Sequence, residues 1–199
     1  SGAQFQTLDD ALAEAAKYFG NKLIQINLLS DITINKTYSI TNILYNNISI
    51  VGSEAKRTIN FDTGAQLNFW SCLFFLKKIN FKTTQSNIGM LRALNNAVGT
   101  IAECSFDGAA TAITCRTSFL SIQACEFTNI SAACVNNYRN GVIDCSYLTI
   151  NANVSSLLSQ NHGGSASVDN TVINSKFTTS KYNLTANTLT RDGIIFDID

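Results

Sequence analysis

A short pattern of apolar and polar positions recurs along the middle of the chain. It consists of an aliphatic residue, two variable residues, a cysteine, one variable residue and an aromatic residue. It reads IAECSF at 101–106, IQACEF at 122–127 and VIDCSY at 142–147. One polar position separates the cysteine from the aromatic residue, and this period of two is typical of a β-strand. The pattern therefore predicts strands that bury the cysteine and the aromatic side chain on one face.

The pattern extends beyond the copies that contain cysteine. LKKINF at 76–81 has isoleucine at the cysteine position, VINSKF at 172–177 has serine there, and LIQINL at 23–28 fits if leucine replaces the aromatic residue. The aromatic column that we expect is Phe81, Phe106, Phe127, Tyr147 and Phe177, with gaps of 25, 21, 20 and 30 residues. Recurrence at such intervals is typical of a solenoid, in which each coil stacks on the next.

The N-terminal region has a different pattern. The apolar residues Leu8, Leu12, Ala15 and Phe19 recur at the spacing of one helix face. Thr7 and Asp10 have the positions of residues that cap the start of such a helix. A solenoid needs its open end covered, because an uncovered first coil is an exposed sheet edge. We therefore expect an N-terminal cap with an amphipathic helix at 1–22 and a β-helix at 23–199.

The composition supports a solenoid and excludes several classes of protein. Hydrophobic residues make up 45% of the 199 residues and charged residues only 14%, while 23 Asn, 19 Ser and 20 Thr supply short side chains suited to turns and ladders. Proline is absent, which agrees with strands that are paired on both sides. The net charge of zero gives no signature of a nucleic-acid partner. No apolar run approaches the ~20 residues of a membrane helix, so we expect no membrane insertion.

The cysteines follow the repeat. We expect Cys104, Cys125 and Cys145 in one column of stacked coils, Cys115 and Cys134 in a second column, and Cys72 alone. We interpret them as buried, reduced thiols that act as small hydrophobic side chains. Disulfides between neighbouring coils are the alternative. The chain has no pair of cysteines separated by two residues and only one histidine, so we expect no metal site and no cofactor.

Three features together resemble a known family. They are the F-x-T-L-x-x-A-L start of the predicted helix at 5–12, the LSDITI segment at 29–34 after an aliphatic strand, and the coils with a cysteine before an aromatic residue. This combination is similar to the right-handed parallel β-helix of bacteriophage tailspikes and tail fibres, within the wider pectate-lyase-like fold. The resemblance covers most of the chain. It implies an all-β, right-handed parallel β-helix (solenoid) of about seven coils with a short N-terminal capping α-helix.

The resemblance also implies a function. Members of that family are usually homotrimers that bind bacterial surface polysaccharide, and many also cleave it with paired carboxylates. We therefore expect a phage tail-fibre or tailspike module of the virion that recognises a bacterial cell-surface glycan, without cleavage by this chain. The alternatives are a polysaccharide depolymerase (a glycoside hydrolase or lyase), a structural fibre spacer, and an adhesin that is extracellular or on the bacterial cell surface. The acidic and basic cluster of calcium-dependent pectate lyases has no match here.

Three carboxylates are the candidates for catalysis. If the copies of the pattern stack in register, Glu103 and Asp144 share a column two coils apart, at ~9.6 Å, and Glu126 lies roughly 8 Å from each. The separation of roughly 8 Å lies within the ~6.5–9.5 Å between the two carboxyl groups of inverting glycosidases. The alternative interpretation is a turn-forming Asp144 and two solvated glutamates on the outer face.

The candidates for glycan contacts are Trp70, Tyr138, Arg139 and His162. Aromatic rings suit the apolar face of a sugar, and we expect Tyr138 to be exposed in a turn. Trp70 could instead belong to the core or to a subunit contact, and a single histidine in a polar loop is commonly just solvated. We expect the binding groove to be formed by longer segments between the repeated patterns, at 82–100 and 148–171, because loops on one edge of a solenoid carry function.

Overall fold

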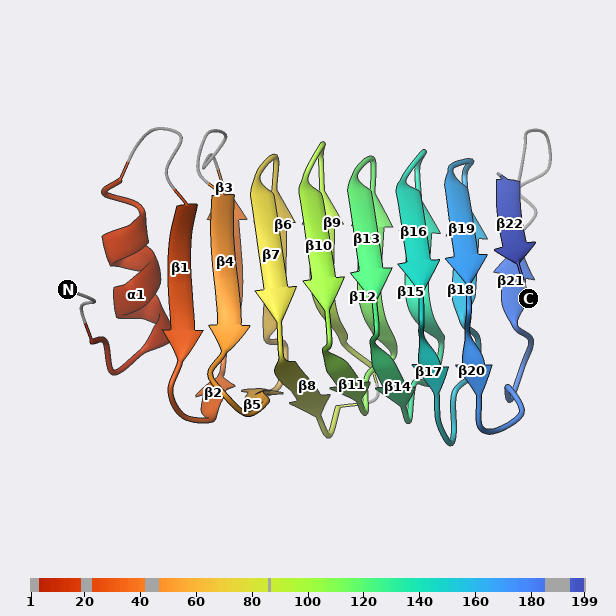
Figure 1. Cartoon of the computed structure of the whole chain (residues 1–199), viewed down its shortest axis with the longest axis horizontal. Helices are drawn as coiled ribbons and strands as arrows, with labels where there is room; N and C mark the ends of the chain where they lie inside the picture. Colours follow the sequence, from red (N-terminus) through yellow and green to blue (C-terminus); the bar gives the residue numbers. More distant parts are fainter. Residues whose placement is uncertain (1–3, 19–22, 42–46, 86, 185–193, 199) are drawn as a thin grey trace.

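The protein is a parallel β-solenoid of about seven coils, as the repeated pattern predicts (Figure 1). The computed structural model describes residues 4–18, 23–41, 47–85, 87–184 and 194–198. Within these residues the strands form three parallel sheets that run along the length of the molecule. We call them sheets A, B and C, in the order in which each coil visits them.

Each sheet takes one strand from every coil. Sheet A contains β1 (Leu23–Leu28), β4 (Asn47–Gly52), β7 (Leu73–Lys77), β10 (Val98–Ala102), β13 (Phe119–Gln123), β16 (Val142–Ser146), β19 (Ser165–Asp169) and β22 (Ile194–Ile198). Sheet B contains β2 (Ile32–Ile34), β5 (Arg57–Phe61), β8 (Ile79–Thr83), β11 (Ser105–Asp107), β14 (Glu126–Thr128), β17 (Thr149–Ile150) and β20 (Val172–Ile173). Sheet C contains β3 (Thr37–Thr41), β6 (Gln66–Trp70), β9 (Gly89–Leu94), β12 (Thr111–Arg116), β15 (Ala133–Tyr138), β18 (Leu158–Asn161) and β21 (Tyr182–Leu184).

The predicted helix is α1 (Leu8–Ala15), and it lies beside β1 at the N-terminal end of the solenoid (Figure 1). The Thr7 hydroxyl accepts the Asp10 amide at 3.1 Å, as expected for the first residue before a helix. Asp9 joins the helix to the first coil, because its carboxylate binds Lys36 at 2.6 Å and accepts the Tyr38 hydroxyl at 2.9 Å. The end of the predicted helix, at Phe19 and Gly20, lies outside the described residues. In the described part of the chain, no helix has the length and apolar character needed to cross a membrane.

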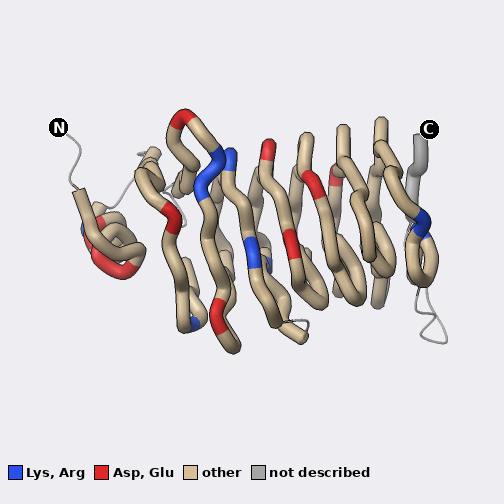
Figure 2. The backbone as a smooth tube through the Cα atoms, turned by 90° about the horizontal axis from the view of Figure 1, so that it is seen from below, with Lys and Arg blue, Asp and Glu red and all other residues tan. Residues whose placement is uncertain are grey.

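From β7 onward, the coils turn from sheet A to sheet B through a single residue with a left-handed backbone, and we call this position the A–B corner. Its members have φ angles of 50° to 55° and are Lys78, Glu103, Ala124, Tyr147 and Asn170. This conformation costs roughly 1–2 kcal/mol for a residue other than glycine. Pairing with the next coil offsets the cost, since the Glu103 amide, for example, donates to the Gln123 carbonyl at 3.0 Å. Figure 2 shows the stacked coils from below, with both signs of charge on neighbouring coils.

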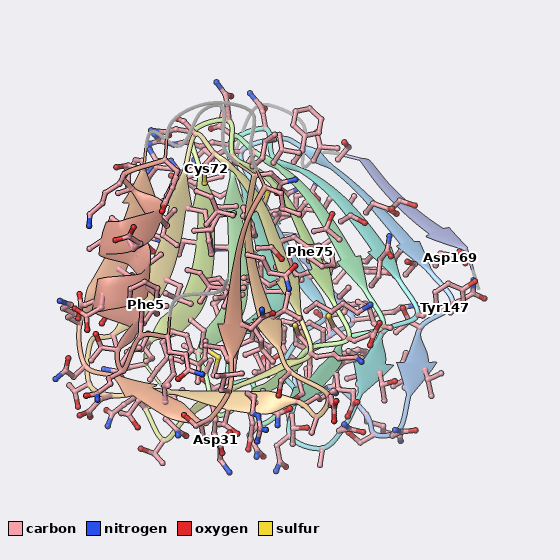
Figure 3. The ribbon with its side chains drawn as sticks, turned by 60° about the vertical axis from the view of Figure 1, so that its left-hand side comes forward. Phe5, Asp31, Cys72, Phe75, Tyr147 and Asp169 are labelled. Carbon is pink, nitrogen blue, oxygen red and sulfur yellow. The ribbon has the colours of Figure 1, made fainter. Side chains whose placement is uncertain are left out.

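The interior contains the predicted aromatic stack, but only in part. Phe81, Phe106 and Phe127 are register partners in sheet B, and their ring centroids lie 5.0 and 5.1 Å apart. The prediction for Tyr147 is wrong: it occupies the A–B corner, is 64% exposed, and lies at the rim of the molecule near Asp169 (Figure 3). Ile150 pairs with Phe127 instead. The segment VIDCSYLTI matches the alternating pattern twice, and the second match, three residues later, is the one that packs.

The cysteines are buried and free, as predicted, but they form fewer columns than expected. Cys104 and Cys125 lie at equivalent positions on neighbouring coils, between the paired ends of sheets A and B. Cys145 does not join them, because the same shift of three residues pairs it with Ile122 in sheet A. Cys115 pairs with Asn137 and not with Cys134. Burial raises the pKa of the Cys115 thiol to about 12, which is the behaviour of an unreactive core side chain.

Candidate functional site

Two of the three candidate catalytic residues lie near each other on the side of sheets A and B. Glu103 occupies the A–B corner and Glu126 begins β14 in the next coil, roughly 8 Å away by the strand spacings. Each carboxylate is ion-paired with a lysine: Lys77 lies 2.9 Å from Glu103, and Lys56 lies 3.1 Å from Glu126. The hydrogen bond from Lys77 lowers the pKa of Glu103. A general acid needs the opposite shift, so Glu103 does not have the properties of a general acid. Glu126 is one partner of a partly exposed ion pair.

The third candidate, Asp144, does not stack over Glu103. Register places Asp144 beside Ser121, and Ser121 beside Thr100, on the outer face of sheet A. Thr100 precedes Glu103 by three residues, so the Cα atoms of Asp144 and Glu103 are separated by two strand spacings and three residue rises, roughly 14 Å. The predicted column of Glu103 and Asp144 is therefore wrong, for the reason that misplaced Cys145 and Tyr147. The three carboxylates do not converge on one point.

Three of the four predicted glycan contacts do come together. They lie where the coils pass from sheet C to sheet A, at turns that we call the C–A corner (71–72, 95–97, 117–118, 139–141 and 162–164). The ring of Tyr138, at the end of β15, meets His162 of the next coil edge to face, with centroids 5.0 Å apart. The guanidinium carbons of Arg139 and Arg116 lie 5.1 and 5.8 Å from the centre of the Tyr138 ring. Tyr138 is half-buried, while Arg139 and His162 are exposed.

The fourth predicted contact, Trp70, lies on the same face of the molecule. Register runs from Trp70 through Leu94 and Arg116 to Tyr138 and Asn161, all at the ends of strands in sheet C. Trp70 is half-buried and three strands from Tyr138, roughly 14 Å away at the usual strand spacing. The four candidates therefore line one row along the outer face of sheet C and its corner.

Buried polar side chains hold the C–A corner in place, and the sequence did not point to them. The amide group of Asn137 donates to the carbonyls of Gly141 at 3.1 Å and Ser165 at 3.2 Å, and that of Gln160 donates to Gly164 at 3.2 Å. Both side chains are fully buried. Their inward orientation is what separates them from the many other polar side chains, and it is known only once the register of the coils is known.

Glycine is required at two positions of these turns. A Cβ atom on Gly141 would overlap the Asn137 side chain and lie 2.9 Å from the Cys115 sulfur. Gly164 has φ +116°, and a Cβ there would lie 2.6 Å from the Gly141 carbonyl oxygen. Close packing and the hydrogen bonds donated by the Asn137 and Gln160 amides thus support the backbone that carries Arg139 and His162.

The segments 82–100 and 148–171 do not form long loops, so the prediction of a groove between them is wrong. They contain β9 and β10, and β18 and β19, which are regular strands of complete coils. The register partners Leu73, Val98, Phe119, Val142 and Ser165 show that successive coils take 25, 21, 23 and 23 residues. The segments only seemed long because the repeated pattern marks one corner of each coil.

A shallow groove of about 520 Å³ lies elsewhere, on the outer face of sheet A. Phe75 lines it, on the face seen in Figure 3. Leu73 and Val98 also line it, and Phe119 is the next register partner beside them; the three are 42%, 43% and 57% exposed. We call these three residues the apolar stripe. Their signal in the sequence is an apolar residue at the first position of successive strands.

Comparison with known proteins leaves the fold as the basis for assigning a function. No protein-family model matches the chain, and no curated protein sequence matches it. Among the described residues, no three histidine, cysteine, aspartate or glutamate side chains gather in a way that could hold a metal ion.

Proposed function

We propose that this chain is a receptor-binding module of a phage tail fibre or tailspike, which binds a bacterial surface polysaccharide without cleaving it. The observation that carries the proposal is the convergence of Tyr138, Arg139 and His162 from two coils onto one corner, in a row with Trp70. An aromatic ring framed by hydrogen-bond donors suits a sugar, which has an apolar ring face and hydroxyl groups at its edge.

The shape of the proposed site supports a chain-like ligand. The row from Trp70 to Asn161 follows the axis of the solenoid, one residue for each coil. Neutral side chains beside the row, such as Asn136, which accepts the Asn161 amide at 3.4 Å, provide further groups that match sugar hydroxyls. A polysaccharide lying along this row could contact several coils, while a single sugar would contact one.

The state of the carboxylates supports the proposal of binding without cleavage. Hydrolysis needs one carboxyl group held protonated near neutral pH, by an apolar pocket or by a close like charge. Glu103 and Glu126 each have a lysine partner instead. Their spacing of roughly 8 Å, from the strand geometry, is the one feature that favours the depolymerase alternative.

We also propose that the module assembles as a homotrimer in the virion. The resemblance to phage β-helices motivates this, and the apolar stripe of Leu73, Val98 and Phe119 gives a surface through which copies could associate. Light scattering tests it: Phe119→Ser should shift a trimer toward monomer, and the control Tyr147→Ser should not. A wild-type protein that is a monomer at micromolar concentration would contradict the proposal.

Titration with purified polysaccharides from candidate host bacteria tests binding. We expect Tyr138→Ala to weaken binding more than tenfold, on the scale of losing an aromatic contact. Tyr147→Ala is the matched control, because Tyr147 is exposed at the A–B corner. No new reducing ends should appear. Cleavage that is lost in Glu126→Gln would replace the proposal with a depolymerase, and binding to no polysaccharide would favour the fibre spacer.

A further inference from the structure

The zero net charge of the chain conceals an uneven distribution of charge. The described strands of sheet C contain no aspartate or glutamate, and their charged residues are Arg92 and Arg116. The described turns of the C–A corner add Arg139 and His162, again with no carboxylate. One face of the solenoid therefore carries three arginines without an acidic residue of its own.

Five lysines of the described chain are arranged differently. All five ion pairs in this part of the molecule join a lysine to a carboxylate on the helix or on the side of sheets A and B: Lys17–Glu14, Lys36–Asp9, Lys56–Glu126, Lys77–Glu103 and Lys82–Asp107. None of Arg92, Arg116 and Arg139 forms an ion pair with a described residue. Asp144 is the carboxylate nearest to Arg139 along the chain, but it lies on the outer face of sheet A and forms no ion pair with a described residue.

The arginines are also close to one another. The guanidinium groups of Arg116 and Arg139 lie against the same Tyr138 ring, at 5.8 and 5.1 Å from its centre. Arg92 belongs to the next strand of sheet C, where Leu94 is the register partner of Arg116. Grouping like charges without a counter-ion is unfavourable, and an anionic ligand would remove that cost. A guanidinium group can also bind a carboxylate, sulfate or phosphate with two parallel hydrogen bonds, which a lysine cannot.

We propose that this arginine face (Arg92, Arg116, Tyr138 and Arg139) selects an anionic polysaccharide, whose acidic groups bind the guanidinium groups while a sugar ring contacts Tyr138. The inference rests on the proposed function, and it specifies the class of ligand. Carboxylate, sulfate and phosphate groups share the chemistry that the face recognises.

The test is titration of the full chain with four probes: alginate, which carries carboxylates; dextran sulfate; neutral dextran; and a single-stranded thymidine oligonucleotide. We expect alginate or dextran sulfate to bind, neutral dextran not to bind, and affinity to fall as NaCl is raised. The double variant Arg116→Gln/Arg139→Gln should weaken binding more than tenfold. The control Lys78→Gln/Lys82→Gln removes the same charge from the side of sheets A and B, and should change affinity less than about twofold.

Each other outcome has a definite meaning. Neutral dextran could bind as tightly as the acidic polysaccharides, with an affinity that neither salt nor the arginine substitutions change. That result would overturn the proposal of an anionic ligand but not the proposal of a glycan-binding module. The lysine control could instead weaken the binding of both acidic polysaccharides as much as the arginine variant does. That result would overturn the assignment of the site to this face. Tighter binding of the oligonucleotide than of either acidic polysaccharide would indicate a nucleic-acid surface and overturn both proposals. No binding of any probe, together with none of host polysaccharide, would also overturn both.

Discussion

The A–B corner and the C–A corner have similar backbone turns but differ in how their charged side chains are paired. At the A–B corner, Glu103 has φ 54° and its carboxylate is neutralised by Lys77 from the strand of the preceding coil. At the C–A corner, Arg139 has φ 51° and its guanidinium group lies over Tyr138, with no carboxylate among its described contacts. The charge of the first corner is paired within the chain, whereas the arginine of the second corner has no ion-pair partner among the described residues.

The difference extends into the interior beneath each corner. Below the A–B corner the side chains are hydrophobic, with the Cys104 and Cys125 thiols beside the stacked phenylalanines. Below the C–A corner, the amides of Asn137 and Gln160 bind the turn carbonyls. Directional hydrogen bonds constrain the position of a turn more tightly than hydrophobic contact does. The corner that we propose as a binding site is thus also the one with the more specific support.

The largest expected effect comes from the core that both corners share. Phe106→Ala should lower the free energy of unfolding by about 3–5 kcal/mol, because it removes the middle ring of the stack and leaves a cavity. Guanidinium titration followed by circular dichroism measures this. Tyr147→Ala removes an exposed ring and should change stability by less than about 0.5 kcal/mol. Equal losses for the two variants would contradict the stacking described here.

The next effect separates the two corners. Asn137→Leu keeps the approximate size of the side chain but removes the donor to Gly141 and Ser165, so it should cost on the order of 1–3 kcal/mol. It should also weaken polysaccharide binding, since the turn carries Arg139. Cys125→Val, beneath the A–B corner, should cost under ~1.5 kcal/mol and leave binding unchanged. Binding that is insensitive to Asn137→Leu would show that this amide does not position the site.

Alkaline pH should act through several buried thiols with raised pKa values, and two of them lie at the C–A corner. Burial raises the pKa of Cys72, in one of its turns, and of Cys115, beneath another, from 9.0 to about 12. Between these values the unfolded chain loses thiol protons that the folded chain retains, so stability should fall as pH rises from 9 toward 12. Denaturant titrations across this range measure the effect, and Cys72→Ala/Cys115→Ala should reduce the slope. If the slope of stability against pH is unchanged in this variant, the pH dependence must come from other groups.

The smallest effect is expected at the A–B corner. Glu126→Gln breaks an ion pair whose side chains are 32% and 49% exposed, so unfolding free energy should change by less than about 1 kcal/mol. Thermal unfolding at low and high salt measures this change and its screening. A loss of several kcal/mol would mean that the pair has a structural role that its exposure does not indicate.

The sequence predicted the fold correctly, but it predicted the register of the stacked coils only in part. Phe81, Phe106 and Phe127 could be aligned because each follows an alternating pattern that fits at one position only. In VIDCSYLTI the pattern fits at two positions three residues apart, and the correct one ends at Ile150. Only packing against Phe127 decides between them. The misplacement of Asp144 as a partner of Glu103 followed from that one choice.

The residues of the candidate site could be predicted from the sequence, but their arrangement in space could not. Tyr138 and Arg139 could be identified because they lie at a turn, and Arg139 is exposed as expected, but Tyr138 is half-buried at the end of β15. Their proximity to His162 depends on a coil of 23 residues between β15 and β18, as Tyr138 pairs with Asn161. The supporting amides of Asn137 and Gln160 could not be distinguished from the many other polar side chains, since what matters is that they point inward.

Hydrogen exchange with and without an acidic polysaccharide tests the contrast between the two corners most directly. Peptides that cover 138–141 and 161–164 contain the C–A turns, and peptides that cover 102–105 and 123–126 contain the A–B turns. We expect the polysaccharide to slow exchange in the first pair and to leave the second pair unchanged. Protection of the Glu103 and Glu126 peptides, with none around Tyr138, would contradict the account and move the site to the carboxylates.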